Sequence, residues 1–445
     1  MRRIGRIAAL GAVAAMGLSG LAACSSGSSS STSGDSAGSV YYLNFKPESE
    51  QQWKDVAAKY KEATGVDVKI VTAASGTYEQ TLKSEVAKSD GPTLFNINGP
   101  VGYQTWKDYT LDLKDTDFAR ALTDKSLAVT DGDSIYGVPF AIEGYGIIYN
   151  KAILDKYFAL SGAKAASVDE INNFDKLKAV ADDMQSKKDQ LGIKGAFAST
   201  SFAPGEDWRW QTHLANYPVF YEFRDDGVSD AKEIKGTYFD NFKKILDLYV
   251  TDSTVPPAET SAKTVTDSMS EFALGQAAFV QNGEWAWSQI ADVQGNVVKP
   301  EDVHFLPIYV GVSGEEKAGI AVGTENFMAV NAKASQASQK ASIDFLNWLF
   351  NSDEGAKLVS GTLNFSAPFQ KTKDMVPSDP LGKEVVEYAN NKDLYPVNWV
   401  FTVFPSQDFK DQLGQHMAQY VSGKEDWASV TTFFKDEWKA EKATE

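Results

Sequence analysis

Apolar and polar positions follow two different periods along the start of the folded chain. An apolar run typical of a buried strand occupies residues 40–45. Helical periodicity follows at 49–65, then a strand pattern at 66–73, a helix around 78–88 and a third strand pattern at 93–98. Because strands that alternate with helices pair in parallel through crossovers, this order predicts a parallel sheet flanked by helices.

The first predicted helix carries start and stop signals. Its apolar residues recur at positions i, i+3, i+4 and i+7, as Trp53, Val56, Ala57 and Tyr60. Ser49 is a candidate N-cap with Gln52 completing a capping box, and Gly65 is suited to end the helix.

The same alternation continues to the end of the chain. The patterns predict an extended stretch leading into a helix at 135–154, strands at 194–200, 276–283 and 325–331, helices at 173–188, 239–250, 264–275, 338–350 and 352–360, and helical structure from 407 onward. One sheet cannot readily hold this many units, so the fold class is α/β with two sheets, and a chain of this length is expected to form two lobes.

The first residues predict a targeting signal. Three arginines precede an apolar stretch at 7–18, which is too short for a confident membrane span and is typical of a signal peptide. The stretch ends in LAAC, residues 21–24, which matches the bacterial lipoprotein motif. Cys24 is the only cysteine, so a lipidated Cys24 is favoured over an ordinary secretory signal with a stray cysteine. Residues 25–39 then form a Ser/Gly tether to a membrane anchor.

Charge and composition narrow the class of ligand. The formal net charge is −17, and removal of the three leading arginines makes the mature chain more acidic still. Such a surface repels nucleic acid and phosphate-rich ligands and suits a neutral or cationic ligand. The 10 tryptophans and 18 tyrosines provide more flat, hydrogen-bonding surface than an average core requires.

Few residues offer catalytic or metal chemistry. The three histidines, His213, His304 and His416, are isolated and lack metal-ligand spacing, so no metal and no cofactor is expected. Three glutamates, Glu143, Glu284 and Glu325, lie at turns beside strands. A pair of them could serve a glycoside hydrolase, but the pattern favours carboxylates that accept hydrogen bonds from a ligand.

Two tryptophan pairs repeat an i, i+2 spacing, Trp208 with Trp210 and Trp285 with Trp287. If the second pair opens a helix, as the preceding Asn282-Gly283 turn indicates, residues two apart point about 200° apart, so one of its two rings is expected to face inward and the other outward. Trp285 follows the strand end at 276–283, where open α/β sheets bind ligands.

Several segments together resemble maltodextrin-type extracellular solute-binding proteins of ABC importers. AAFVQNGEWAWSQI, 277–290, is similar to the family segment NGxWAWxxI, and GVPFAIEGYGIIYNKAIL, 137–154, to its first crossing between lobes. AVGTENFMAVN, 321–331, resembles the second crossing, and NWVF, 398–401, a late aromatic contact segment. The LAAC motif fits the family in Gram-positive bacteria.

The resemblance implies a two-lobed, type II periplasmic-binding-protein-like fold, each lobe a mainly parallel sheet flanked by helices and joined by hinge crossings. Its implied parts are signal peptide 1–23, tether 24–39, an N-terminal lobe of 40–142 and 324–370, and a C-terminal lobe of 143–323 and 371–445. It implies a lipid-anchored monomer outside the cell that binds a neutral di- to oligosaccharide and delivers it to a permease. The alternatives are the glycoside hydrolase and a same-fold receptor for a peptide or polyamine.

The resemblance also carries over a set of ligand-binding residues. Trp285 corresponds to a sugar-stacking tryptophan and Trp399 to a late stacking aromatic, while Trp287 becomes core. The other implied positions are Asn282, Glu284, Glu143, Tyr145, Glu325, Asn326, Phe401, Trp208, Trp210, Lys46, Glu48, Asn96, Asn98 and Tyr103. The chain departs from the family at Thr93, where Asp is usual, and in the loop FKPE, 45–48, which argues against maltose itself.

Overall fold

The computed structural model describes residues 38–74 and 76–443. The predicted signal peptide, the lipidated Cys24 and nearly all of the tether lie outside these residues. Within the described ranges, no helix combines the length and apolar character needed to cross a membrane.

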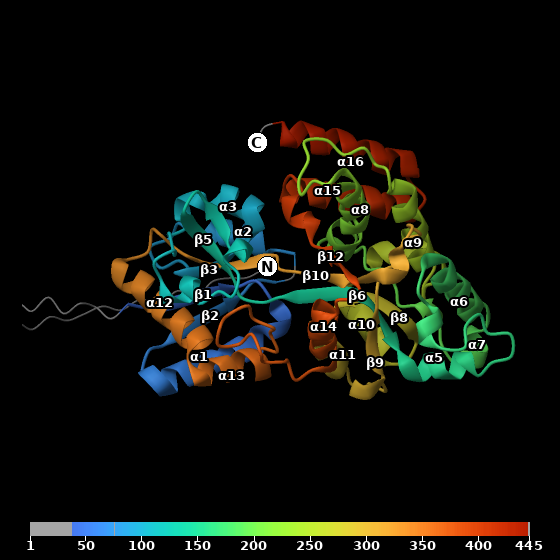
Figure 1. Cartoon of the computed structure of the whole chain (residues 1–445), viewed down its shortest axis with the longest axis horizontal. Coiled ribbons are helices and arrows are strands. Elements are labelled where there is room, and N and C mark those ends of the chain that lie inside the picture. Colours follow the sequence, from blue (N-terminus) through green and yellow to red (C-terminus); the bar gives the residue numbers. More distant parts are fainter. Residues whose placement is uncertain (1–37, 75, 444–445) are drawn as a thin grey trace, which may run out of the picture. The chain divides into compact units, whose positions relative to one another are not determined.

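Two six-stranded sheets organise the described chain (Figure 1). The first has the order β2-β1-β3-β11-β5-β4, and the second β12-β10-β6-β8-β7 with β9 also paired to β6. The strands of the first sheet are β1 (Val40–Asn44), β2 (Val68–Thr72), β3 (Leu94–Asn98), β4 (Val129–Asp131), β5 (Ser134–Pro139) and β11 (Asn326–Val330). Those of the second are β6 (Glu143–Asn150), β7 (Gly195–Phe197), β8 (Ala277–Gly283), β9 (Val303–Leu306), β10 (Ala318–Gly323) and β12 (Tyr395–Asn398).

Both faces of the first sheet are buried, because alternate strand residues enter two different cores. Tyr42 packs with α1, α4, α12 and α13, whereas its neighbours Tyr41 and Leu43 pack with α2 and α3 on the opposite face. These helices are α1 (Glu50–Thr64), α2 (Tyr78–Glu85), α3 (Gly99–Trp106), α4 (Asp117–Arg120), α12 (Gln336–Asn351) and α13 (Asp353–Gly361).

The second sheet is covered in the same way. Ile147 of β6 enters a core with α5 to α9, α15 and α16, and Ile148 enters another with α10, α11 and α14. The bounds are α5 (Lys151–Phe158), α6 (Phe174–Ser186), α7 (Lys188–Leu191), α8 (Asn216–Asp226), α9 (Phe239–Thr251), α10 (Val265–Ala273), α11 (Ala286–Ala291), α14 (Pro380–Asn390), α15 (Gln407–Val421) and α16 (Trp427–Lys442).

The expectation of mainly parallel sheets was wrong, because both sheets are mixed. In the first, β1 pairs in parallel with β2 and β3 as predicted, but β11 is antiparallel to β3 and β5, and β4 is antiparallel to β5. In the second, β6 is antiparallel to β8, β9 and β10. The strands β6 and β11 each enter their sheet directly from a strand of the other sheet, β5 and β10 respectively. Without a crossover helix between sequential strands of one sheet, they are free to run antiparallel to their neighbours.

Helix α1 follows its sequence signals at one end only. Its predicted apolar residues are all buried, and Gly65 ends the helix with φ of 78°. The capping box at its start was wrong: the Ser49 side chain makes no cap bond, and its hydroxyl donates to the carbonyl of Lys46 instead. The short 3₁₀ turn η1 (Pro47–Ser49) turns Ser49 back towards the end of β1.

Strand register brings distant segments to one end of the second sheet. Glu143, the first residue of β6, pairs with Gly323, the last residue of β10. Two residues further on, Tyr145 pairs with Gly283, the last residue of β8. Glu325 lies between β10 and β11, directly before the first residue of β11, so this end of the second sheet is also where the chain passes to the first.

Candidate functional site

A continuous set of charged and aromatic side chains gathers at this end of the second sheet. We call it the central cluster; it consists of Lys46, Glu143, Tyr145, Trp208, His213, Glu284, Trp285, Glu325, Trp399 and Phe401. Lys46 follows β1 of the first sheet, and Glu143 and Tyr145 lie on β6 of the second. The central cluster therefore joins the two sheets.

A buried ion pair links the two sheets within the central cluster. Lys46 Nζ donates to Glu143 Oε1 at 2.5 Å and approaches Glu48 Oε1 at 3.4 Å. The side chains of Lys46 and Glu143 are only 7% and 4% exposed, so each charge depends on the other. Burial lowers the pKa of Lys46, but the Glu143 and Glu48 carboxylates outweigh it and hold that pKa above its ordinary value, so Lys46 is charged.

Glu284 lies beside this pair and is tied to β6. Its Oε2 accepts from the Gly144 amide at 2.9 Å, and its own amide donates to the Gly144 carbonyl at 3.1 Å. Burial raises the pKa of Glu284 well above 4.5, and the charge of Glu143 raises it further. Burial likewise raises the pKa of Glu143 against the opposing effect of Lys46. A raised pKa favours the protonated carboxyl, and in that form Glu284 can donate as well as accept a hydrogen bond.

Aromatic rings surround His213. Its imidazole stacks on Tyr145 with ring centres 4.2 Å apart and planes at 12°. The rings of Trp208, Trp285, Trp399 and Phe401 lie with centres 5.2, 5.6, 5.9 and 5.4 Å from the imidazole. Lys46 Nζ lies 5.2 Å from the centre of the Trp285 ring, which joins the aromatic side chains to the charged ones.

His213 and Glu325 titrate in opposite directions from their ordinary values. Burial lowers the pKa of His213 and outweighs the attraction of the Glu325 carboxylate, whose Oε2 lies 3.8 Å from Nε2. Burial acts to raise the pKa of Glu325, but His213, Lys410 and Lys46 together hold it below 4.5. At neutral pH this part of the central cluster thus presents a neutral imidazole beside an ionised carboxylate.

Two glycines provide the space in which two of the tryptophans lie. A Cβ placed on Gly283 would meet the Trp285 ring at 2.2 Å, and one placed on Gly323 would meet Trp399 at 2.5 Å. Each ring therefore covers the backbone of the glycine that ends its neighbouring strand. Trp399 Nε1 is buried without a hydrogen-bond partner among the described residues, as is His213 Nδ1.

The two tryptophans of the second pair pack against different cores, as their spacing predicts, and both are only partly buried. Trp285 packs against the core of α5, α8 and α15, and Trp287 against that of α10 and α14. In the other pair, Trp208 contacts Trp285, with ring centres 6.1 Å apart, while Trp210 is 3% exposed and packs on Phe202. Trp287 is only partly buried, so its expected core role was overstated.

Some sequence-predicted site residues lie outside the central cluster. Asn282 is fully buried, where its amide donates to Met269 Sδ and accepts from Gly283. Asn96 is also fully buried and accepts from the Tyr42 hydroxyl at 2.8 Å. Their polar groups are used within the fold.

Two further predicted residues lie in strands of the first sheet, and a third, Tyr103, lies on α3, which packs on that sheet. Tyr103 stacks on Tyr136 and donates to Asp131. Asn98 and Asn326 pair across β3 and β11, and Asn98 Oδ1 is buried without a partner in the described chain. The helix that follows Asn98, α3, contacts η9 (Val400–Val403), so this pair lies near the chain segment that carries Trp399.

Sequence reasoning missed His213 and Lys410. His213 stands five residues after Trp208, and the two rings meet edge to face because η5 (Arg209–Leu214) is a π-helical segment. Lys410 is buried on α15 with Nζ 5.7 Å from the centre of the Phe401 ring. The only sequence signal for His213 is its place beside a tryptophan pair, and nothing in the local sequence marks a π-helix.

Known proteins resemble the chain over most of its length. A sequence model of the family described as bacterial extracellular solute-binding protein matches residues 55–390. No curated protein matches the chain. Among solved structures, a chitin-oligosaccharide-binding protein is similar, with a TM-score of 0.69, 18% identity, and coverage of 91% of this chain and 99% of that chain.

Two further solved structures agree with this likeness. The solute-binding protein RafE in complex with raffinose has a TM-score of 0.67 at 18% identity, over 91% of this chain and 99% of its own. Maltose-bound MalE3 of T. maritima has a TM-score of 0.66 at 16% identity, over 91% and 100%. At these identities the likeness establishes the fold, two mixed sheets flanked by helices in the two-lobed periplasmic-binding-protein arrangement.

Proposed function

The chain belongs to the bacterial extracellular solute-binding proteins, and from this premise we propose that it captures a neutral oligosaccharide at the central cluster and delivers it unchanged to an ABC importer. The observation that carries the proposal is the arrangement of Trp208, Trp285 and Trp399 around one imidazole, beside buried carboxylates. Sugars present apolar C–H faces and hydroxyl edges, and such a site offers flat rings for the first and hydrogen-bonding groups for the second.

The position of the central cluster supports a role in closure. Lys46 reaches Glu143 from the other sheet, so a ligand bound here contacts residues carried by both. A ligand that binds one arrangement of two lobes more tightly than another shifts the population towards it, and the permease can recognise that arrangement. We further propose that the lobes divide at 142/143, 323/324 and 370/371.

The solved structures named above support the ligand class, since their names specify chitin oligosaccharide, raffinose and maltose. The raised pKa values of Glu143 and Glu284 suit hydrogen bonding to hydroxyls, and we propose that no chemistry follows binding. We also propose a monomer held by lipid on Cys24 at the outer face of the cytoplasmic membrane of a Gram-positive bacterium.

The test is a calorimetric titration of the full chain with a panel of neutral malto-, chito- and xylo-oligosaccharides and raffinose, followed by analysis of the recovered sugar. Saturable binding to at least one sugar, recovered intact, is expected. Hydrolysis of the sugar would contradict the proposal and indicate a glycosidase instead. Absence of binding to every sugar of the panel would reject neutral oligosaccharides as the ligand class.

Trp285→Ala tests the site itself. Loss of a central stacking tryptophan is expected to cost at least about 2 kcal/mol of binding free energy, or about thirtyfold in affinity, and to lower the thermal unfolding midpoint no more than Trp287→Ala does, because both rings are partly buried. Trp287→Ala is the matched control, because its ring packs on the other side of the sheet and should leave affinity intact. Equal losses in both variants would contradict the assignment of Trp285.

A further inference from the structure

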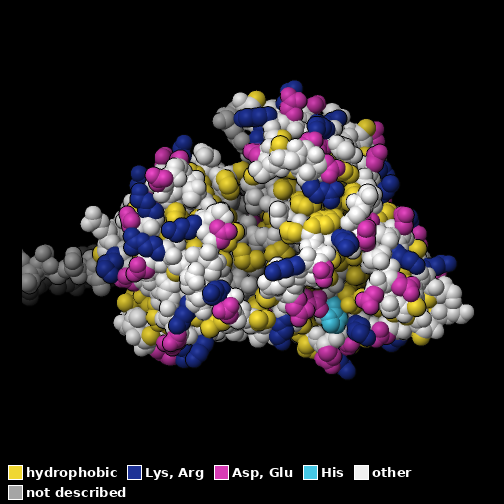
Figure 2. All heavy atoms as spheres, in the orientation of Figure 1, with side chains coloured by type: hydrophobic (Ala, Val, Ile, Leu, Met, Phe, Trp, Pro, Cys, Tyr) yellow, Lys and Arg dark blue, Asp and Glu magenta, His cyan; other side chains and the backbone are white. Residues whose placement is uncertain are grey.

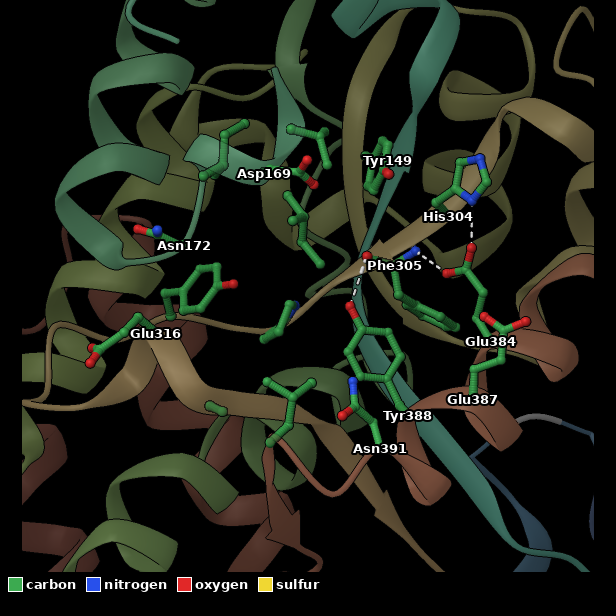
Figure 3. A pocket seen from close by; sticks show the side chains of 17 residues that line it. Tyr149, Asp169, Asn172, His304, Phe305, Glu316, Glu384, Glu387, Tyr388 and Asn391 are labelled. Atoms are coloured by element: carbon green, nitrogen blue, oxygen red, sulfur yellow. Dashed lines mark hydrogen bonds and ion pairs between the residues drawn. The ribbon is translucent and has the colours of Figure 1, made fainter. Parts of the chain in front are cut away.

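A groove of about 420 Å³ opens on the second sheet, away from the central cluster (Figure 3). Its walls come from β6, β9, the end of α14 and the segments around η4 (Val168–Glu170) and η8 (Glu315–Lys317). No residue of the central cluster lines it. Its volume falls within the range of sites that hold small molecules.

The groove has acidic walls. Asp169, Glu316, Glu384 and Glu387 line it, and no lysine or arginine of the described chain does. Figure 2 shows carboxylates gathered over α14 beside a histidine. The lining histidine, His304, bonds Glu384 through Nδ1, and this carboxylate raises its pKa. The groove is therefore electronegative even with that pair formed.

Some of the lining groups are already used within the fold. Glu384 bonds both His304 and the Phe305 amide, the latter at 2.7 Å, and the Tyr388 hydroxyl donates to the Phe305 carbonyl at 3.3 Å (Figure 3). The side-chain carboxylates of Glu316 and Glu387, which line the groove, make no hydrogen bond or ion pair with any described residue. Their charges are available to a ligand.

Two buried tyrosines indicate a binding site independently of the acidic side chains. Tyr149 and Tyr309 are only 7% and 5% exposed, and both line the groove. Neither hydroxyl has a hydrogen-bond partner in the described chain, yet neither is sealed from solvent as the hydroxyl of Tyr249 is. Buried hydroxyls normally find a partner, so two that open into one groove are placed to bind what enters it.

We propose that this groove is a second binding site, for a small organic ammonium ion. Free carboxylates at Glu316 and Glu387 attract the cation, the rings of Tyr149 and Tyr309 offer aromatic surface to it, and their hydroxyls accept hydrogen bonds from its N–H groups. The site is separate from the central cluster and does not depend on which sugar the central cluster binds.

The test is a calorimetric titration of the full chain with spermidine, at low and at physiological salt. Saturable binding with one site is expected, weaker at higher salt. The double variant Tyr149→Phe with Tyr309→Phe removes both hydroxyls and keeps the rings, and should weaken binding about tenfold. Glu316→Gln with Glu387→Gln should weaken it by at least as much.

Matched controls separate this result from damage to the fold. Tyr249→Phe removes a buried hydroxyl of the same core, and Glu437→Gln neutralises a carboxylate of α16; neither group has a partner among the described residues, and both variants should bind spermidine like the parent. Absence of saturable binding would overturn the proposal. So would binding that the tyrosine and glutamine variants retain but Trp285→Ala loses, because the amine would then occupy the central cluster.

Discussion

Gly283 and Gly323 lack side chains, and the space that this leaves is filled by tryptophan rings. Each ends a strand, and each is covered by an indole ring that a single methyl group would displace. The position of Trp285 and Trp399 therefore depends on the absence of a side chain at these two glycines. Because protein interiors are close-packed, a ring pushed from such a place cannot simply be accommodated elsewhere.

Gly323→Ala is accordingly expected to lower sugar affinity by about tenfold or more, because the indole of Trp399 must move. Calorimetric titration measures the change. Gly319→Ala, in the same strand, is the control: its new methyl group would lie in ordinary contact at 3.5 Å. The explanation fails if both variants bind sugar alike.

Trp287 should contribute less to stability than a core tryptophan. Truncation of a fully buried tryptophan costs about 3–5 kcal/mol, but Trp287 is only partly buried. Trp287→Ala should therefore lower the free energy of unfolding by less than that range, as measured by denaturant unfolding. A loss at the upper end of the range would show that its indole carries more packing than its exposure indicates.

At the scale of elements, the hydrophobic period predicts which segments are helices and strands but not how they pair. The helix α1 and the strands β1, β2 and β3 follow the period closely. The antiparallel placement of β11 and β6 depends on contacts between segments far apart in sequence. The same limit applies to η5, whose π-helical turn brings His213 to Trp208 and which no local pattern announces.

Asp207, just before η5, should make stability depend on pH. Burial raises its pKa from 3.8 to about 6, so the folded state binds this proton more tightly than the unfolded chain does. The contribution is present at low pH and is lost as pH rises from about 4 to about 6. The Asp207→Asn variant lacks this pH-dependent contribution. The thermal unfolding midpoint of the variant, relative to that of the parent, should therefore rise as the pH increases from about 4 to about 6.

The comparison requires thermal melts of both proteins at several pH values between 4 and 8. Between low pH and pH 8, the stability of Asp207→Asn relative to the parent should rise by at most ~3 kcal/mol, given the size of the pKa change. Asp240→Asn, which removes an exposed carboxylate on α9 that takes no part in the Asp207 shift, serves as the control and should show no such trend. A constant difference between parent and Asp207→Asn would contradict the assignment.

At the scale of the whole molecule, the ion pair between Lys46 and Glu143 connects the two sheets. The sequence placed both residues in the site only through family resemblance, since 97 positions separate them and nothing local predicts that they meet. The aromatic residues that surround His213 come from four segments far apart in the sequence, and nothing local predicts that these segments meet either. Turns and apolar periods can be recognised from the chain, whereas the composition of the central cluster follows from register and packing.

Lys46→Met should destabilise the protein by about 3–5 kcal/mol, because it leaves the Glu143 carboxylate buried without a counter-charge. Denaturant unfolding measures the loss. The double variant Lys46→Met with Glu143→Gln should recover part of it, since no isolated charge remains. Strictly additive losses would show that the two residues are not coupled.

The central claim, that a neutral oligosaccharide binds at the central cluster, is tested most directly by a crystal structure of the chain with the tightest sugar of the panel. We predict a sugar ring against the face of Trp285, with Trp208 and Trp399 within contact of the same ligand and hydroxyls bonded to Glu143, Glu284 or Glu325. A sugar bound elsewhere on the molecule, with these side chains arranged as in the unliganded protein, would contradict the account.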